Sequence, residues 1–570
     1  MKDTATMTNA SVSAADEAPR IRRNDYSTLK RPEIGAWTPT ELVSVVIPAY
    51  QDQDKLDLVL AALTAQSYPV ELLEVIVVDD GSEPPLELRG PHPDRTRILP
   101  NRPGHWASAS AVDTAIRASE GPIILRLDAD VIPDRQHVEA HARWHHSADY
   151  LTVMGKIAFV EADPAEFDAV TVRDKIAADE GQTLFDEYDV EYKWVIKFVE
   201  ETDGLRSDER RAFSAANGAS ISFRRALYDA CGGLDVGMRL GADTELGFRL
   251  AQAGAVFVPE AEATAWHVGI SQMRKQNSDA TRFREPFLSN RVPSFRYMRT
   301  PRSGTHWKVP YVEVIVDAAD ARLEQVRATV DSVLGGTVRD VSVTLLGPWN
   351  ELGEERNALL DDPMLDLRLI RESFQSDPRV RFASAAAEDP APVPFRVVLD
   401  SGLDLSHRAL EELTDLAEKR RVGRVRLALT DENGREHRVV LDRTAALARA
   451  KRLRGEDESL EEAINSIWGV HCEEGSAWFL RSENDTEPQL RAYSSRLQSL
   501  REEERALRAR VDRWNKAGNK ARADAKDWER AAREWQEAAG WWEHRSKQRD
   551  RGRRGLLRRA AGRVKRTLGR

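Results

Sequence analysis

Two β-branched runs separated by an amphipathic segment constrain the fold of this 570-residue chain more than any other feature. The first run is residues 43–48 (Val-Ser-Val-Val-Ile-Pro), and the second is residues 75–79 (Val-Ile-Val-Val-Asp). Between them Leu56, Leu60 and Leu63 recur at helical spacing. Runs of this kind predict strands, and the segment between them predicts a helix. A strand, a helix and a second strand in this order predict an α/β fold with a doubly wound, mostly parallel sheet.

Two acids follow a third predicted strand of the same sheet. Residues 123–127 (Ile-Ile-Leu-Arg-Leu) lead directly into Asp128 and Asp130, which one residue separates. Ligands of such sheets bind beyond the carboxyl ends of the strands. Paired carboxylates there can hold a hard cation, Mn²⁺ or Mg²⁺, that also contacts phosphate oxygens. We therefore predict Asp130 as a metal ligand with Asp128 beside it; a solvated acid pair in a turn is the alternative.

The second half of the chain repeats the strand, helix and strand order of the first half. Residues 395–404 resemble residues 124–130 and are followed by a similar helical segment. Gly402 stands where the first copy has Asp130, so the paired-carboxylate spacing is lost. The sequence therefore predicts an internal duplication whose second, smaller α/β domain is a non-catalytic relative of the first.

The two ends of the chain differ in composition from its middle. Residues 1–42 lack periodicity and are rich in small and charged residues, which predicts a disordered leader. Between Leu490 and Trp542 apolar residues alternate at spacings of three and four. This pattern predicts a helix that packs on another helix, and we favour self-association over packing on a domain. The predicted units are a leader at 1–42, a catalytic domain at 43–300, a degenerate domain at 309–482, a heptad helix or coiled coil at 487–545 and a basic tail at 549–570.

Charge and cysteine content limit where the protein acts. The formal net charge of -10 argues against a nucleic-acid-binding protein. Cys231 and Cys472 are too far apart for a local disulfide or zinc framework, which fits a reducing cytoplasm. Residues 551–570 carry nine basic residues and no acid, with apolar residues on one helical face. This tail predicts contact with an anionic membrane surface, and a solvated tail is the alternative.

We expect neither a membrane-spanning helix nor a secretory signal, because the chain has no apolar run of about 18 residues and no apolar N-terminal segment before a cleavage site. The expected location is the cytoplasm, with the basic tail favouring the inner face of the plasma membrane.

Four segments occur in an order typical of one enzyme family. They are residues 45–50 (Val-Val-Ile-Pro-Ala-Tyr), 77–82 (Val-Val-Asp-Asp-Gly-Ser), 127–130 (Leu-Asp-Ala-Asp) and 241–250 (Gly-Ala-Asp-Thr-Glu-Leu-Gly-Phe-Arg-Leu). Together they resemble glycosyltransferase family 2, which has the GT-A fold, over about residues 43–270. The resemblance implies an inverting, metal-dependent transferase with a nucleotide-sugar donor, by default a UDP-sugar.

The resemblance also implies roles for residues at the nucleotide. It places Pro48, Ala49 and Tyr50 in the nucleoside pocket, with Asp80 accepting a hydrogen bond from the base and Asp79 beside it. Strand-end acids can instead cap the following turn, which is the alternative for both. The resemblance also makes Asp128, next to the predicted metal ligand, a donor-binding residue.

At the fourth segment the family usually has Glu-Asp, where this chain has Ala242 and Asp243. The resemblance implies that Asp243 is the general base on the acceptor hydroxyl, and the missing carboxylate at Ala242 leaves acceptor alignment or full activity open. A first-turn acid that the helix dipole favours is the alternative. The resemblance also makes His267 a metal or diphosphate contact, against a purely structural histidine.

Many relatives carry an arginine near the nucleotide, in a segment after Gly104 where this chain has small residues. Arg102 and Arg126 are two candidates for that charge. Each could equally pair with a structural acid.

These residues together predict an in-line displacement in which Asp243 deprotonates the acceptor while a cation held by Asp130 stabilises the leaving diphosphate. The expected partners are a nucleotide-sugar donor and a glycan or lipid-linked acceptor in cell-surface polysaccharide or glycoconjugate synthesis. Two alternatives remain. One is a scaffold that binds nucleotide or glycan without turnover, and the other is a sugar nucleotidyltransferase, which would carry a Gly-rich basic phosphate loop after its first strand.

Overall fold

The computed structural model describes residues 18–185, 193–269, 277–299, 306–353, 359–430, 436–474 and 476–480. The chain divides into compact units at Met1–Arg481 and Ser482–Arg570, and all described residues belong to the first. The heptad helix predicted at 487–545 and the basic tail predicted at 549–570 lie outside the described residues. In the described ranges, no helix combines the length and the apolar character needed to span a bilayer.

The first sheet has eight strands in the order β3-β2-β1-β4-β7-β6-β8-β5. The first four of these are parallel neighbours, and β7 runs antiparallel to both β4 and β6. The predicted α/β fold is therefore confirmed, and the strands that carry the first three sequence motifs are parallel. The strands are β1 (Val43–Ala49), β2 (Leu73–Asp79), β3 (Thr96–Pro100), β4 (Ile123–Leu127), β5 (Val131–Pro133), β6 (Leu151–Val160), β7 (Ser220–Arg224) and β8 (Val256–Val268).

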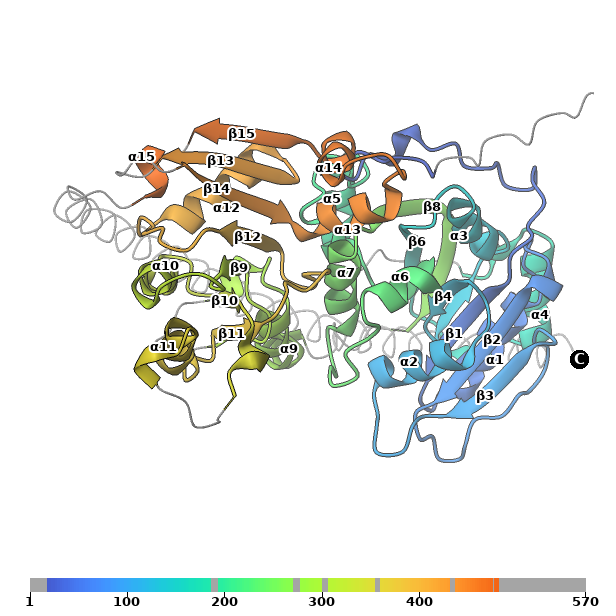
Figure 1. The fold of residues 1–570 in the computed structure, drawn as a ribbon. Coiled ribbons are helices and arrows are strands. Elements are labelled where there is room, and N and C mark those ends of the chain that lie inside the picture. Colours follow the sequence, from blue (N-terminus) through green and yellow to red (C-terminus); the bar gives the residue numbers. More distant parts are fainter. Residues whose placement is uncertain are drawn as a thin grey trace, which may run out of the picture. The chain divides into compact units, whose positions relative to one another are not determined.

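Helices cover both faces of this sheet (Figure 1). In β1, Val45 and Ile47 pack in one core cluster with residues of α1 and α4, whereas Val46 packs in another with residues of α2 and α7. Both faces of the strand are buried, which explains its continuous apolar run. The helices of this half are α1 (Gln53–Leu63), α2 (Ser108–Ala118), α3 (His137–His145), α4 (Ala169–Ala177), α5 (Lys193–Glu201), α6 (Arg225–Ala230), α7 (Ala242–Gln252) and α9 (Asn277–Arg291).

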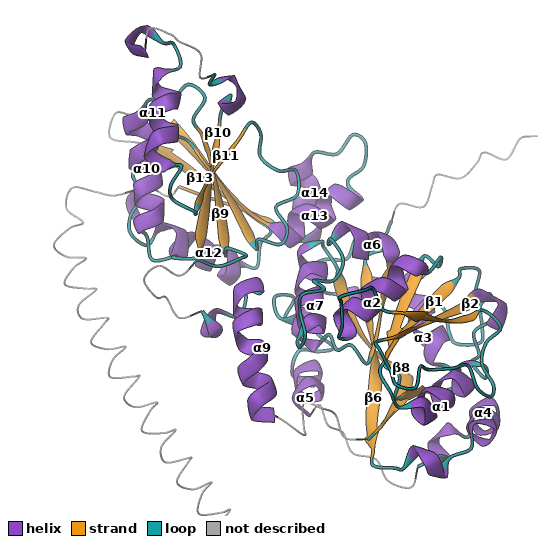
Figure 2. Cartoon of the chain, turned by 90° about the horizontal axis from the view of Figure 1, so that it is seen from below, coloured by secondary structure: helices purple, strands orange, loops and turns teal. Residues whose placement is uncertain are grey.

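The second sheet has seven strands in the order β11-β10-β9-β12-β14-β13-β15. Figure 2 shows its strands in orange as a sheet separate from the first. If β9 to β15 are matched in chain order to β1, β2, β3, β4, β6, β7 and β8, this order is the one found in the first sheet. The orientations agree as well, since β14 is antiparallel to both β12 and β13 and β13 is parallel to β15. The duplication predicted from sequence is thus present in the strand order. The strands are β9 (Val312–Asp317), β10 (Val341–Leu346), β11 (Val380–Ala383), β12 (Phe395–Leu399), β13 (Arg424–Thr430), β14 (Glu436–Arg443) and β15 (Val470–Glu474).

The helices around the second sheet include a pair, α13 and α14, that lies against the first half of the chain. Arg449 of α13 is 1% exposed and donates to the carbonyls of Gly254 and Ala255, which follow α7. The two sheets therefore share a packed boundary. The helices are α10 (Leu323–Gly335), α11 (Leu365–Phe374), α12 (Ala409–Arg420), α13 (Thr444–Leu453), α14 (Leu460–Ile467) and α15 (Ser476–Phe479).

The prediction of a disordered leader is wrong for residues 18–42. Ile21 is fully buried, and the Asn24 side chain pairs with the backbone of Phe257 in both directions at 2.8 and 2.9 Å. Trp37 donates its indole N–H to Glu139 at 2.9 Å. The segment has no periodicity because it packs through isolated side chains of an irregular chain with one short 3-10 helix at Tyr26–Thr28, and periodic patterns reveal only regular helices and strands.

A chain of buried histidines and serines joins α3 to β7. His137, His141 and His145 lie one helical turn apart. The two nitrogens of His141 contact Ser222 and Ser220 at 2.9 Å each. His137 contacts Ser220 at 3.0 Å, and His145 contacts Ser222 at 2.7 Å. Burial lowers the pKa of His137 to about 4 and holds the pKa of the other two well below the ordinary value.

We expect this network to make the protein sensitive to acid. Below about pH 6.5 the histidines of the unfolded chain bind protons, whereas the same histidines in the folded protein stay buried and neutral. The free energy of unfolding therefore falls as the pH falls. The free energy of unfolding falls by up to about 1.4 kcal/mol per pH unit for each histidine. At pH 4 His137 alone lowers the free energy of unfolding by about 3 kcal/mol. Urea unfolding between pH 7 and pH 5 measures this. His141→Gln should flatten the slope and the exposed-site change His105→Gln should not; equal slopes in all three proteins would contradict the account.

Candidate active site

Three of the predicted motifs meet at one edge of the first sheet. β1 is parallel to β2, with Ala49 opposite Asp79, and is also parallel to β4. The turns after these strands therefore lie together at the carboxyl edge, where ligands of such sheets bind. Pro48 and Ala49 end β1 and Ala49 is buried, whereas Tyr50, just beyond the strand, is 59% exposed. Tyr50 thus offers an accessible ring at this edge.

Asp79 caps the turn that follows β2. Its carboxylate accepts hydrogen bonds from the backbone N–H groups of Gly81, Ser82 and Leu86 at 3.1, 2.8 and 3.0 Å. Burial disfavours the charged form, but these bonds outweigh it and lower the pKa of Asp79. The turn-capping alternative therefore describes what Asp79 does in the structure, and its role at the nucleotide stays a prediction.

Asp80 holds the loop that follows β3. Its two oxygens accept from the side-chain amide of Asn101 at 2.6 Å and from the backbone N–H of Ala107 at 2.7 Å. A carboxylate has about four lone-pair sites, so these two bonds leave room for a hydrogen bond from a base. Asp80 is positioned by this loop rather than by its own turn.

Strand pairing brings Asp130 and His267 together. β5 is antiparallel to β8 with Val131 opposite His267, and the carbonyl of Asp130 accepts from the backbone N–H of Val268. As a result Nε2 of His267 lies 3.5 Å from Oδ1 of Asp130. Nζ of Lys55, from α1, lies 3.8 Å from Oδ2 of the same carboxylate. Burial raises the pKa of Asp130, and His267 and Lys55 only partly offset this.

These residues fit a divalent cation that is shared with a ligand. Two donors bound to one cation at about 2.1 Å lie about 3 to 3.5 Å apart, which is the separation of Asp130 and His267. Phe159 stacks on the imidazole, whose Nδ1 is buried without a hydrogen-bond partner among the described residues. Within the described ranges no three His, Cys, Asp or Glu side chains form a metal cluster. Diphosphate oxygens and water would therefore complete the coordination.

Arg126 links the paired acids to the predicted base. Its Nη2 lies 3.2 Å from Oδ1 of Asp128 and 3.0 Å from the hydroxyl of Ser108. The guanidinium lies directly against Gly218, where an added Cβ would be 2.2 Å from it. The backbone N–H of Gly218 in turn donates to Oδ2 of Asp243 at 3.3 Å. Asp128 and Asp243, distant in sequence, thus belong to one contact network.

Asp243 lies in the first turn of α7, behind the left-handed Gly241 at φ +79°. Ala242, where the family usually has Glu, is only 9% exposed and packs in the core. Glu245 does not replace the missing carboxylate, because it is buried and paired with Arg249 at 2.8 Å. Asp243 is thus the acid that this helix presents to the network around Arg126 and Gly218.

Residues 44–197 match the family described as Glycosyl transferase family 2. The chain contains a glycosyltransferase family 2 domain. The chain is 36% identical over 102 residues to glycosyltransferase AglE of Haloferax volcanii, and 33% identical over 109 residues to validoxylamine A glucosyltransferase of Streptomyces hygroscopicus subsp. jinggangensis. These matches cover 17% and 19% of this chain, and 33% and 26% of the relatives. The chain therefore spans a third or less of the length of these relatives.

Two solved structures resemble the chain more distantly. One is the mannosyltransferase PcManGT from Pyrobaculum calidifontis in complex with GDP-Man and Mn²⁺, with a TM-score of 0.29, 20% identity and coverage of 48% of this chain and 69% of that one. The other is S. aureus TarS, with a TM-score of 0.28, 14% identity and coverage of 44% and 40%.

Two residues of the glycosyltransferase family 2 domain that sequence reasoning missed lie at this edge. One is Lys55 beside Asp130. The other is Trp106, which is 60% exposed in the loop held by Asp80 and has the guanidinium of Arg239 4.3 Å from its ring centre. The sequence does show a lysine shortly after the first strand and an aromatic residue in a loop that contains glycine. No rule of spacing marks either residue as part of a site.

The two arginines considered for the nucleotide have different partners in the structure. Arg102 donates to Asp113 of α2 at 2.7 Å, so it has the structural partner that was the alternative. Arg126 lies among Asp128, Ser108 and Gly218, at the predicted site. Of the two, Arg126 is the one that contacts a predicted site residue, Asp128.

We expect Gly218→Ala to damage this site more than the fold. Its methyl group would have to displace the buried guanidinium of Arg126, and with it Asp128. A misplacement of about 1 Å can cost about a hundredfold in rate, so kcat/KM for transfer should fall by about that factor. Steady-state kinetics with a thermal unfolding curve tests this. Gly335→Ala, where the added Cβ meets nothing within 4 Å, is the control; an equal loss in both variants would contradict a local effect.

Proposed function

We propose that this chain is an inverting, metal-dependent glycosyltransferase that moves a sugar from a nucleotide-diphosphate donor, probed first as a UDP-sugar, to a hydroxyl acceptor. The observation that carries the proposal is the gathering of Asp128, Asp130, His267 and Asp243 around one edge of the sheet whose first strands overlap the residues 44–197 that match glycosyltransferase family 2. The proposed setting is cell-surface polysaccharide or glycoconjugate synthesis in the cytoplasm or at the inner face of the plasma membrane, with a glycan or lipid-linked acceptor.

Donor binding uses the three strand ends. Pro48, Ala49 and Tyr50 face the nucleoside, and Asp80 accepts a hydrogen bond from the base. Asp130 and His267 would hold Mn²⁺ or Mg²⁺, which supplies positive charge to the diphosphate when it is bound. Arg126 keeps the neighbouring Asp128 in place through their 3.2 Å contact.

Transfer is a single displacement. Asp243 takes the proton of the acceptor hydroxyl as that oxygen bonds to the anomeric carbon. The bond between this carbon and the diphosphate oxygen breaks at the same time, and the nucleoside diphosphate leaves with the electron pair. Because attack and departure occur on opposite faces of the sugar, the anomeric configuration inverts.

The proposal is tested by nucleotide release from a panel of UDP- and GDP-sugars with Mn²⁺ or Mg²⁺. We expect release that needs the cation and that falls at least about a hundredfold in Asp130→Ala. Asp94→Ala, at an exposed acid in the loop before β3, is the matched control. Release that is the same in Asp130→Ala and in the wild type would overturn the proposal.

A scaffold without turnover is the second candidate, and the burial of Ala242 in place of a carboxylate favours it. It predicts that UDP binds to the wild-type chain while no donor of the panel is consumed. Calorimetric titration of UDP beside the release assay separates the two.

A further inference from the structure

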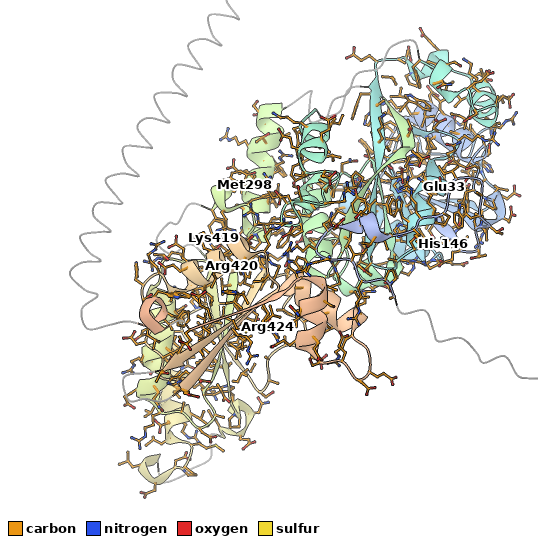
Figure 3. All side chains as sticks on the ribbon, turned by 90° about the horizontal axis from the view of Figure 1, so that it is seen from above. Glu33, His146, Met298, Lys419, Arg420 and Arg424 are labelled. Carbon is orange, nitrogen blue, oxygen red and sulfur yellow. The ribbon has the colours of Figure 1, made fainter. Side chains whose placement is uncertain are left out.

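A large cavity borders α7 on the side of the second sheet. Its volume is about 710 Å³, within the range of ligand-binding cavities. Thr244, Ala251 and Gln252 of α7 line one wall, and Phe395 and Trp468 of the second half line another. Thr244 lies in the first turn of α7, so the cavity starts at the end of the helix that carries Asp243 and extends along it, without Asp243 itself in the lining. Met298, labelled in Figure 3, belongs to the same lining.

The cavity carries an excess of positive charge. Seven of the described residues that line it are arginines, whereas two, Glu209 and Glu418, are acidic. Glu418 is shared by Arg210 at 3.8 Å and Arg443 at 3.2 Å, and Glu209 pairs with Arg421. Acids outside the lining pair with two more of these arginines, Asp208 with Arg211 at 2.6 Å and Asp340 with Arg296. Arg23, Arg284 and Arg449 have no ion pair among the described residues, and a partly enclosed space strengthens their attraction for anions.

Two buried polar groups of the lining have no partner among the described residues. They are Oε1 of Gln252, whose residue is 8% exposed, and Nε1 of Trp468, whose residue is 4% exposed. Buried polar groups are normally paired, and a ligand hydroxyl beside this acceptor and this donor would give each of them a partner. Water could pair with both atoms, but water does not balance the arginine charge.

Aromatic rings complete the lining. Trp194 and Tyr297 are 55% and 77% exposed, and Phe295 lies beside Tyr297 with ring centres 5.9 Å apart. Rings of this kind bind the apolar faces of sugars while nearby polar groups bind the hydroxyls. Positive charge, unpaired hydrogen-bonding groups and exposed rings in one cavity fit an anionic carbohydrate.

We propose that this cavity binds the body of the acceptor, a glycan whose polyol chain carries phosphate or carboxylate groups. This assignment rests on the proposed function, because the cavity runs from the end of α7 that carries Asp243, where an acceptor hydroxyl would lose its proton. The second sheet domain then contributes acceptor binding through Trp468 and Phe395 rather than catalysis.

The test is direct titration of the full chain, without donor, with three six-unit probes: a glycerol-phosphate oligomer, an oligogalacturonate and neutral maltohexaose. We expect the anionic probes to bind at least about tenfold more tightly than the neutral one, and whichever of the two binds better identifies the anionic group. Gln252→Met and Trp468→Phe should each raise Kd about tenfold, as expected for a lost hydrogen bond to a charged ligand. Gln375→Met, at an exposed glutamine after α11, should not.

Arg284→Glu, at a partly exposed lining position, keeps the test decisive if a core variant fails to fold. Equal binding of all three probes, no binding, or affinities that neither Arg284→Glu nor the folded core variants change would overturn the inference. Nucleotide release measured in parallel separates the two proposals. Release without glycan binding rejects the acceptor site alone, and glycan binding without release rejects the transferase alone.

Discussion

Asp243→Asn is expected to lower kcat for sugar transfer by about a thousandfold while leaving the affinity for nucleotide nearly unchanged. General base catalysis contributes about 10² to 10⁴ in rate, and an amide cannot accept the acceptor proton. The side chain keeps its shape and can still accept the N–H of Gly218, which lies 3.3 Å from the carboxylate. The loss should therefore appear in chemistry and not in folding.

Measuring transfer and UDP binding in the same preparation makes the Asp243 prediction specific. Asp229→Asn, at an exposed acid near the end of α6, is the matched control and should transfer sugar at the wild-type rate. If kcat falls less than about tenfold in Asp243→Asn, Asp243 is not the general base. It would then be a first-turn acid that the helix dipole favours.

Arg449→Met should be the most destabilising single change at the boundary between the two sheets. The guanidinium is buried and donates to the carbonyls of Gly254, Ala255, Ile21 and Arg23. Burial lowers its pKa to about 10, so it stays charged at neutral pH. Removing it takes this donor from four carbonyls, three of them in buried contacts, and we expect a loss of about 3 to 5 kcal/mol in the free energy of unfolding.

Denaturant unfolding of Arg449→Met beside Arg452→Met tests this expectation. Arg452 also reaches the first half of the chain, through Asp149 at 3.2 Å, but that pair is partly exposed to solvent. Exposed pairs contribute at most about 1 kcal/mol, so the control should be nearly as stable as the wild type. Similar losses in both variants would mean that the guanidinium of Arg449 is not the group that holds the boundary.

Local pattern was sufficient to predict the elements that carry the site. β1, β2 and β4 lie where the apolar runs predicted strands. The echo of residues 124–130 in residues 395–404 predicted a duplication, and both sheets have the same strand order. The sequence alone predicted the loss of the second carboxylate at Gly402, because the paired-acid motif is defined by its spacing along the chain. Both faces of these strands are buried, so their sequence reports their structure directly.

Contacts between distant segments were not predictable in this way. The prediction of a disordered leader failed because Ile21 and Asn24 pack individually, without a repeating pattern in the sequence. Nothing in the sequence distinguished Arg126 from Arg102, since the choice depends on which acid lies within reach after folding. Likewise, Trp468 reaches the cavity beside α7 only because α13 and α14 pack against the first half.

The sequence by itself determined the strands, the paired acids and the family resemblance, because a strand and the turn after it are encoded by consecutive residues. Only the tertiary structure decided that His267 lies 3.5 Å from Asp130 and that Gly218 connects Arg126 to Asp243. These contacts follow from the pairing of β5 with β8 and from the docking of α7 against the first sheet. Such pairings depend on how whole surfaces pack, and no local spacing in the chain records them.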